Sequence, residues 1–228
     1  MPLYRFADVT VHIPSVSPFA AAFFEDYRVQ AASFDEEIVL TDADIENEAS
    51  FAASPREILE ITAVLRRFSA ILLARYDGCM LHAATVVHNG KAYAFVAPSG
   101  TGKTTQCRLW CDVFGEDTRI LNGDKLLIRK QGDRILAYGN PWRGKEHYGE
   151  NGCYPLSGIY LLHRATVNSR CAVQPKDALG ALLSAVAVSK DGQARMRLLA
   201  LLADVLTCVP IYDLYANRQP DAVYTALG

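Results

Sequence analysis

A glycine-bearing loop between an apolar run and a helix-forming run has the clearest chemical meaning in this sequence. Residues 97–104 read Ala-Pro-Ser-Gly-Thr-Gly-Lys-Thr and fit the pattern G-x-x-x-x-G-K-[ST], apart from alanine at its first position. Gly100 and Gly102 allow successive backbone N–H groups to turn toward an anion, and the start of the following helix adds partial positive charge. The stretch predicts a site for the phosphates of a nucleotide.

The side chains of this loop suit the same chemistry. Lys103 can reach the β- and γ-phosphates, and the Thr104 hydroxyl can ligate a phosphate-bound Mg²⁺. The alternative is an ordinary glycine turn, but a strand before the loop and a helix after it favour the phosphate site. The predicted nucleotide-binding residues are Ser99, Gly100, Thr101, Gly102, Lys103, Thr104 and Thr105.

A carboxylate and a histidine are the next candidates. Asp124 ends the stretch Ile120–Asp124, one helix and one strand after Lys103, where a metal ligand or catalytic carboxylate is expected. His82 lies on the strand that pairs by a hairpin with the strand feeding the loop, so it can reach the phosphate region. The structural alternatives are a turn residue at Asp124 and a hydrogen-bonded core histidine at His82.

A charged, glycine-rich segment follows at residues 139–152. Such a loop after the aspartate suits an acceptor-binding or phosphate-stabilising role. Arg143 is the first candidate for a phosphate contact and Lys145 the second. Trp142 can stack on a base or a peptide, but a tryptophan in this setting more often anchors its loop.

Composition limits the classes of function. The chain has 228 residues, half of them hydrophobic, and a net charge of −2, which predicts neither a nucleic-acid nor a membrane partner. No apolar run is long enough to cross a bilayer, and the first residues lack the apolar stretch of a signal peptide. The six cysteines show no CxxC pair, so they are expected to be reduced and the protein cytoplasmic.

The N-terminal stretch predicts a small β-rich unit. Residues 3–13 alternate like one half-buried strand, and 27–30 and 37–40 suggest short strands. The acidic run 42–48 is expected to be a solvated loop. Ser54–Glu57 has the form of a capping box, and apolar residues then repeat at helical spacing until Asp77. The predicted division is a lead-in at 1–53 and a core at 54–228.

The rest of the chain predicts a mixed sheet with helices. Asn89-Gly90 should join two strands in a tight hairpin, and two hairpins flanking a phosphate loop differ from a regular parallel sheet. The expected strands are 80–87, 91–96, 118–122, 125–129, 134–138, 157–163 and 209–215, and the expected helices are 102–114, 175–188, 193–206 and 220–227.

These motifs together resemble the superfamily of HPr kinase/phosphorylase and phosphoenolpyruvate carboxykinase. The resemblance rests on Leu81–Thr85, the hairpin, the loop 97–105 and Leu121–Asp124, and it covers residues 79–165 best. It implies a mixed-sheet P-loop kinase core like that of the carboxykinase, metal near His82 and Asp124, and phosphoryl transfer. Asn122–Lys125 retains one carboxylate of the family's aspartate pair, and Arg143-Gly144 is similar to the Arg-Gly of the HPr kinase signature loop.

The sequence therefore predicts a Mg²⁺-dependent kinase of the HPr kinase type. Lys103 and the loop amides would hold the phosphates of ATP or GTP, while Thr104 and Asp124 share the metal. Asp124, aided by His82, would orient or deprotonate the acceptor hydroxyl, and Arg143 would stabilise the moving phosphoryl group. The acceptor is a serine of a protein or peptide, or a small molecule. The alternatives are a nucleotide-binding regulatory protein without catalysis and, with less support, carboxykinase chemistry.

Overall fold

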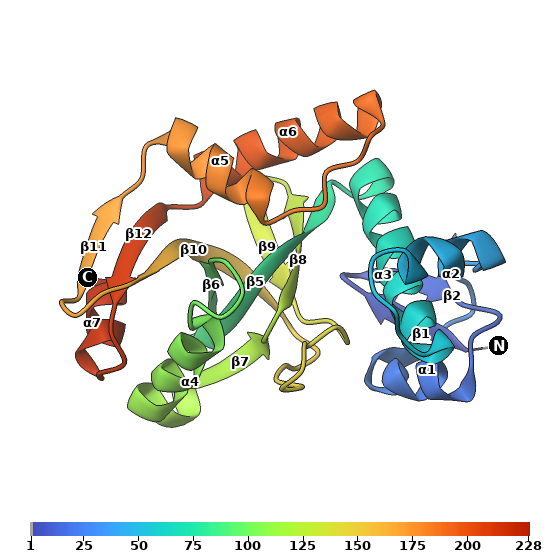
Figure 1. Ribbon diagram of the computed structural model, residues 1–228, viewed down its shortest axis with the longest axis horizontal. Coiled ribbons are helices and arrows are strands. Elements are labelled where there is room, and N and C mark those ends of the chain that lie inside the picture. The colour runs from blue at the N-terminus through green and yellow to red at the C-terminus, as the bar shows by residue number, and fades with distance from the viewer. Residues whose placement is uncertain (1) are drawn as a thin grey trace.

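The N-terminal part of the chain forms a four-stranded sheet at one end of the molecule (Figure 1). The computed structural model describes residues 2–228. Stretch 3–13 is not one strand as predicted but a hairpin, because Ala7 and Asp8 adopt left-handed φ angles of 48° and 60°. In the order β3-β1-β2-β4, the sheet consists of β1 (Leu3–Phe6), β2 (Val9–His12), β3 (Arg28–Val29) and β4 (Glu36–Glu37).

Helices cover this small sheet, and one of them contradicts the sequence prediction. The segments are α1 (Pro18–Phe23), the 3-10 turn η1 (Glu25–Tyr27), α2 (Asp42–Ala49) and α3 (Arg56–Arg75). The prediction of a loop over 42–48 is wrong, because Thr41 and Asp44 form a reciprocal capping box that starts α2. The capping box predicted at Ser54–Glu57 is not formed: Pro55 is the N-cap of α3 and makes no side-chain bond.

A larger sheet of eight strands carries the rest of the chain. Its order is β11-β12-β10-β6-β5-β8-β9, with β7 beside β5. The strands are β5 (Gly78–His88), β6 (Lys91–Val96), β7 (Thr118–Asn122), β8 (Lys125–Gln131), β9 (Arg134–Tyr138), β10 (Cys153–Arg164), β11 (Ser169–Ala172) and β12 (Ile211–Ala216).

Two long strands fold this sheet back on itself. β5 pairs with β8 over its first half and with β6 and β7 over its second half. β10 pairs with β9 at its start and then runs parallel to β6 and β12. The pairings β5–β8–β9–β10–β6–β5 thus close a ring. The prediction of a mixed sheet with flanking helices is confirmed, since parallel and antiparallel pairs occur together.

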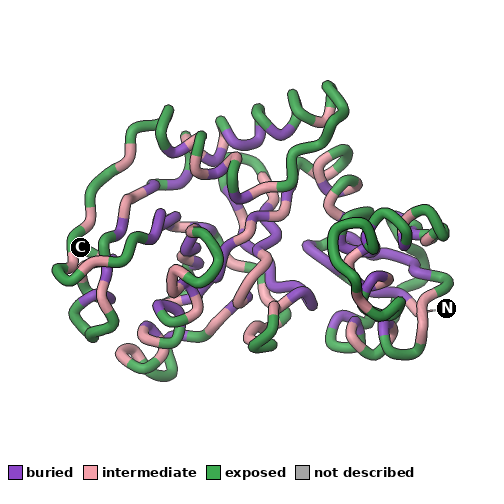
Figure 2. The backbone as a smooth tube through the Cα atoms, in the orientation of Figure 1, coloured by how far each residue is buried: buried purple, intermediate pink, exposed green. Residues whose placement is uncertain are grey.

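Helices pack on both faces of the larger sheet. On one face lie α4 (Lys103–Phe114), followed by the 3-10 turn η2 (Gly115–Asp117), and α7 (Asp221–Leu227). On the other lie α5 (Pro175–Ser184) and α6 (Gly192–Cys208). Buried residues run along the central strands while the outer helix faces are exposed (Figure 2). No helix within residues 2–228 combines the length and apolarity that crossing a bilayer requires.

A shared apolar cluster joins the two sheets. The N-terminal strands and Val64, Phe68 and Leu72 of α3 pack together with Leu127, Tyr138 and Trp142 of the larger unit. Trp142 is 4% exposed, and its indole N–H donates to the Ile61 carbonyl of α3 at 3.0 Å. The segment after β9 is therefore anchored to the N-terminal part of the molecule.

Candidate functional site

The glycine loop (residues 97–104) leaves the end of β6 and enters α4, as its sequence predicts. Gly100 and Gly102 have φ angles of 80° and 117°, a backbone region that side chains with a Cβ rarely occupy. α4 begins at Lys103, so its first N–H groups have no partner within the helix and face the loop. The loop therefore has the backbone geometry of an anion-binding turn.

Lys103 is folded back onto the loop. Its ammonium donates to the carbonyl of Ala97 at 2.9 Å and to that of Pro98 at 3.4 Å, and the residue is only 7% exposed. Burial lowers the pKa of Lys103, and the negative charge of Asp124 partly opposes that shift. Because the Lys103 ammonium is shielded from water, its positive charge can bind a strongly anionic group that enters the loop.

Arg164, which the sequence analysis did not single out, supports the glycine loop from the end of β10. Its guanidinium donates to the Thr101 carbonyl at 2.9 Å and also to the carbonyl of Gly100. Because β10 runs parallel to β6, both strands end at the same edge of the sheet. In the sequence, the only signal for this role of Arg164 is its place at the end of a strand that neighbours β6.

A cavity of about 350 Å³ lies between the glycine loop and the ends of β10 and β12. Gln106 is buried on its wall, where its amide N–H donates to the Asn217 carbonyl at 2.8 Å while its Oε1 has no partner. The cavity is lined by Thr101, Gly102, Thr105, Gln106, Leu162, His163, Arg164, Ala165, Ala216, Asn217 and Arg218. Thr101, Gly102 and Thr105 are predicted nucleotide-binding residues, and the remainder were missed.

On the other side of β6 from this cavity, the Asp124 carboxylate contacts two neighbouring side chains. Its Oδ1 lies 3.2 Å from His82 Nε2, and its Oδ2 accepts from the Lys125 ammonium at 2.8 Å. The His82 hydrogen bond, helped by Lys125, holds the pKa of Asp124 well below its ordinary range despite partial burial. The His82 side chain is 43% exposed, so the alternative of a histidine enclosed in the apolar core does not apply.

The charged loop (residues 139–152) covers this carboxylate. A Cβ added to Gly144 would lie 2.7 Å from the Asp124 Cβ, so the loop backbone passes directly over it. Gly123 N–H donates to the Tyr148 carbonyl at 3.0 Å, which fixes the loop to the end of β7. Lys145 is exposed to solvent. The loop therefore encloses one side of Asp124, whose side chain is still 29% exposed.

The Arg143 side chain contacts the N-terminal part of the chain. Its guanidinium donates to Asp26 at 3.1 Å and lies 5.8 Å from the ring centroid of Tyr27, both in the N-terminal part of the chain. The Arg143 side chain is 19% exposed, and its Nε has no partner. The structure thus brings together His82 and Asp124, places Lys103 within electrostatic range of Asp124, and leaves the Arg143 guanidinium on a separate contact.

The Asp124 carboxylate offers oxygen donors to a hard cation, but a metal site there would need further ligands from a bound group. Within residues 2–228, no three side chains of the His, Cys, Asp and Glu types gather as a metal cage. Mg²⁺, however, is usually held by one or two protein oxygens together with phosphate oxygens and water. The Thr104 hydroxyl and the Asp124 carboxylate supply oxygen donors of that kind, so their chemistry fits this ion.

Comparison with known proteins adds little. No family model matches this chain, and no curated protein sequence does. Among solved structures, the chain is similar to the HPr(Ser) kinase/phosphatase from Coxiella burnetii, over 56% of this chain and 87% of that one. Because the TM-score is 0.31 and the identity 9%, this likeness carries no argument about fold or chemistry.

Proposed function

We propose that this protein binds a nucleoside triphosphate at the glycine loop and transfers its γ-phosphate to a hydroxyl group. The buried Lys103 ammonium carries the proposal, because it lies at the start of α4 and, among residues 2–228, hydrogen-bonds to loop carbonyls alone. The β- and γ-phosphates would take over this cation and the N–H groups that surround it. Ser99 to Thr105 would form the cradle, as expected for ATP or GTP.

The nucleoside would occupy the cavity beside the loop. A volume of about 350 Å³ is within the usual range for small-ligand sites. Arg164, Asn217 and the unpaired Gln106 Oε1 give this cavity polar groups that can orient a base or a ribose. Because β6 lies between β10 and β5 in the sheet, the phosphates would extend from this cavity toward Asp124.

The His82–Asp124 pair would act on the acceptor. A carboxylate with a lowered pKa is a weak proton acceptor, so we assign Asp124 to orientation and metal binding, and the proton to His82. The acceptor oxygen would form a bond to the γ-phosphorus as the bond to the bridging oxygen breaks, and its proton would pass to the imidazole. The Lys103 ammonium would stabilise the charge on the transferred group.

Mg²⁺ would be held by Thr104 and Asp124 and would neutralise phosphate charge when bound. The acceptor is a serine of a protein or peptide, or a small hydroxy compound. Arg143 would contribute only if its bond to Asp26 opened, since its guanidinium now contacts the N-terminal part of the chain. Gly144, the residue after Arg143, has a φ of 74°, a backbone conformation that mainly glycine adopts.

A second candidate function is nucleotide binding without catalysis. Two observations favour it: Arg143 is paired with Asp26, and both oxygens of the single carboxylate Asp124 already contact neighbouring side chains. A regulatory protein needs the glycine loop and the cavity but not a free catalytic carboxylate. Carboxykinase chemistry has no comparable observation in its favour.

Incubation with γ-labelled ATP, Mg²⁺ and candidate acceptors separates these functions. We expect label to appear on a hydroxyl acceptor and to be lost in Asp124→Asn. Asp133→Asn is the control, because Asp133 lies in the exposed β8–β9 turn. Binding of ATP with neither transfer nor hydrolysis would establish the second candidate, and absence of ATP binding would exclude both.

A further inference from the structure

Two asparagines that the sequence analysis left without a role are completely buried beside Asp124. Asn122 ends β7 and Asn140 follows β9, and each is 0% exposed. Removing amide side chains from water is costly unless they are hydrogen-bonded. Their partners therefore show what this burial achieves.

Asn122 shapes the turn that presents Asp124. Its Oδ1 accepts the backbone N–H of Asp124 at 2.9 Å and that of Lys125 at 2.8 Å. Its Nδ2 donates to Asn140, at 3.2 Å from the carbonyl oxygen and 3.1 Å from the side-chain oxygen. The amide thus fixes the backbone of the two residues that form the Asp124–Lys125 ion pair.

Asn140 completes the connection from the opposite side. Its Nδ2 donates to the Lys125 carbonyl at 2.5 Å, and its Oδ1 accepts the Trp142 N–H at 3.0 Å. The carbonyl and the N–H of Lys125 are therefore both held by this asparagine pair. Through Trp142 the same pair determines where the charged loop leaves β9 and passes over Asp124.

We infer that Asn122 and Asn140 are positioning residues for phosphoryl transfer, setting the Asp124 carboxylate against His82 and beneath Gly144. The inference rests on the proposed function. Neither asparagine touches the glycine loop residues that would bind nucleotide, so the pair should affect the rate of transfer and leave nucleotide affinity unchanged. Misplacing a reacting group by about 1 Å can cost a hundredfold in rate.

The pair requires amides at both positions. Each asparagine uses its oxygen as acceptor and its NH₂ as donor, so an aspartate at either position would face an acceptor without a proton to donate. Alanine at position 122 would leave the N–H groups of Asp124 and Lys125 without their acceptor. Serine at position 140 removes fewer contacts and is the milder change.

The test measures turnover with γ-labelled ATP and ATP affinity by calorimetry in Asn122→Ala and Asn140→Ser. We expect about a tenfold to hundredfold loss of turnover with ATP affinity within about twofold of wild type. Asn47→Ala, on the exposed face of α2, is the control for residue type, and Val205→Ala in α6 is the control for lost stability. Both controls should keep wild-type turnover at a temperature where they are folded.

A second readout separates positioning from general destabilisation. If the pair positions Asp124, Asn140→Ser should lower kcat and leave the KM for ATP near its wild-type value, whereas partial unfolding would lower the fraction of protein that binds ATP in calorimetry. Full turnover in both asparagine variants, or an equal loss in Val205→Ala, would overturn the inference alone. Absence of transfer by the wild-type protein would overturn the proposed function and the inference with it. Should Asn122→Ala fail to fold, Asn140→Ser decides the result.

Discussion

At the scale of single residues, the charge of Asp124 decides how the candidate site can work. His82 and Lys125 both bind its carboxylate, and together they lower its pKa. A carboxylate that stays ionised holds a metal or orients an imidazole well, but it removes a proton from a hydroxyl poorly. The division of labour between Asp124 and His82 follows from this environment. The sequence pattern alone had predicted both roles for Asp124.

The first prediction concerns Lys103. We expect Lys103→Ala to weaken ATP binding by about 1.5–3 kcal/mol, because a charge-assisted contact to phosphate is lost. Titration calorimetry measures the affinity, and Lys91→Ala is the matched control because Lys91 is exposed at the start of β6. The same affinity in Lys103→Ala and wild type would remove the assignment of the glycine loop as a phosphate site.

The second prediction concerns Asp124. Asp124→Asn keeps the shape of the side chain but removes the negative charge that would bind Mg²⁺ together with the Thr104 hydroxyl. Turnover should therefore be abolished. Affinity for ATP measured without metal should change only modestly. Calorimetry with EDTA and a transfer assay with Mg²⁺ provide the two measurements. A variant that transfers phosphate at the wild-type rate would return Asp124 to a structural role in its turn.

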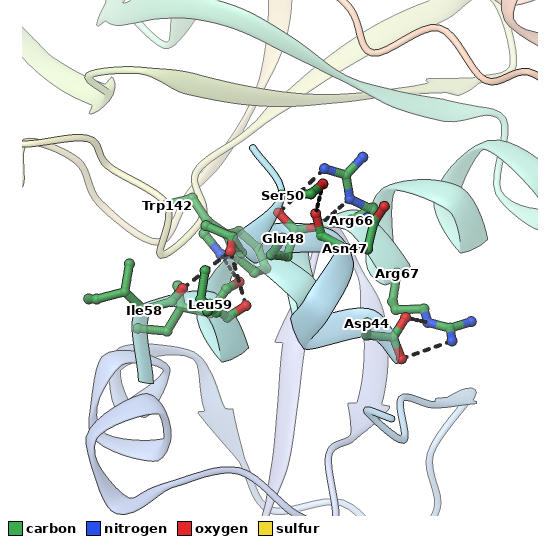
Figure 3. A network of polar contacts seen from close by, with 11 residues as sticks. Asp44, Asn47, Glu48, Ser50, Ile58, Leu59, Arg66, Arg67 and Trp142 are labelled. Carbon is green, nitrogen blue, oxygen red and sulfur yellow. Dashed lines mark hydrogen bonds and ion pairs between the residues drawn. The ribbon is translucent and has the colours of Figure 1, made fainter. Parts of the chain in front are cut away.

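At the scale of elements, helix α2 depends on charged contacts with α3. Asp44 accepts from the Arg67 guanidinium at 2.8 and 2.9 Å, and Glu48 pairs with Arg66 one turn later (Figure 3). Asp44 also accepts the Thr41 N–H in the capping box. Few apolar side chains of α2 are buried, so these contacts hold it in place.

The third prediction is a pH dependence of that contact. The Arg67 hydrogen bond lowers the pKa of Asp44 to about 2, below the value of about 3.9 expected in the unfolded chain. Its stabilising effect is therefore complete above about pH 4 and is lost as the pH falls through about 2. We expect Asp44→Asn to reduce the unfolding free energy by about 1–2 kcal/mol at pH 7, and the difference from wild type to shrink toward pH 2.

Urea unfolding between pH 7 and pH 2 tests this dependence. Asp42→Asn is the control, because Asp42 pairs with Arg56 while its side chain is 84% exposed and such pairs contribute little. A constant difference between Asp44→Asn and wild type over the whole pH range would show that the ion pair does not stabilise α2.

Local sequence patterns predicted the helices, strands and turns better than they predicted the contacts between residues far apart in the chain. The Asn89-Gly90 turn gave the β5–β6 hairpin, and both residues have the left-handed φ angles that a tight turn requires. Thr41 and Asp44 were overlooked as a capping box because the acidic run around them was taken as solvated. The contact of Arg143 with Asp26, 117 residues away, has no local signature in the sequence. The Asn122–Asn140 pair and the cavity likewise depend on the closed ring of strands.

At the scale of the whole molecule, the N-terminal part supports the loop that covers Asp124. The Tyr27 hydroxyl donates to the Glu150 carbonyl at 3.2 Å, and Asn151 donates to the Asp26 carbonyl at the same distance. Trp142 adds the bond to α3 described above. The N-terminal sheet and α3 therefore help to set the position of the charged loop, although they lie far from the glycine loop in sequence.

The last prediction tests whether Arg143 also acts in transfer. Asp26→Asn leaves the guanidinium in place but removes its ionic partner, whereas Arg143→Ala removes the guanidinium itself. If the guanidinium turns toward the phosphoryl group during transfer, Arg143→Ala should lower turnover about a hundredfold, as loss of a charge-stabilising donor does. Asp26→Asn should retain wild-type turnover and lose at most about 1 kcal/mol of unfolding free energy, since Asp26 is 69% exposed.

The two variants also distinguish transfer from support of the loop. A guanidinium that acts only in transfer changes the rate without weakening ATP binding, and calorimetry measures that affinity directly. If Arg143→Ala and Asp26→Asn lower stability together while each folded variant transfers phosphate at the wild-type rate, the ion pair is purely structural. In that case the charge on the moving phosphoryl group would be balanced by Lys103 and the metal held at Thr104 and Asp124, without an arginine from the charged loop.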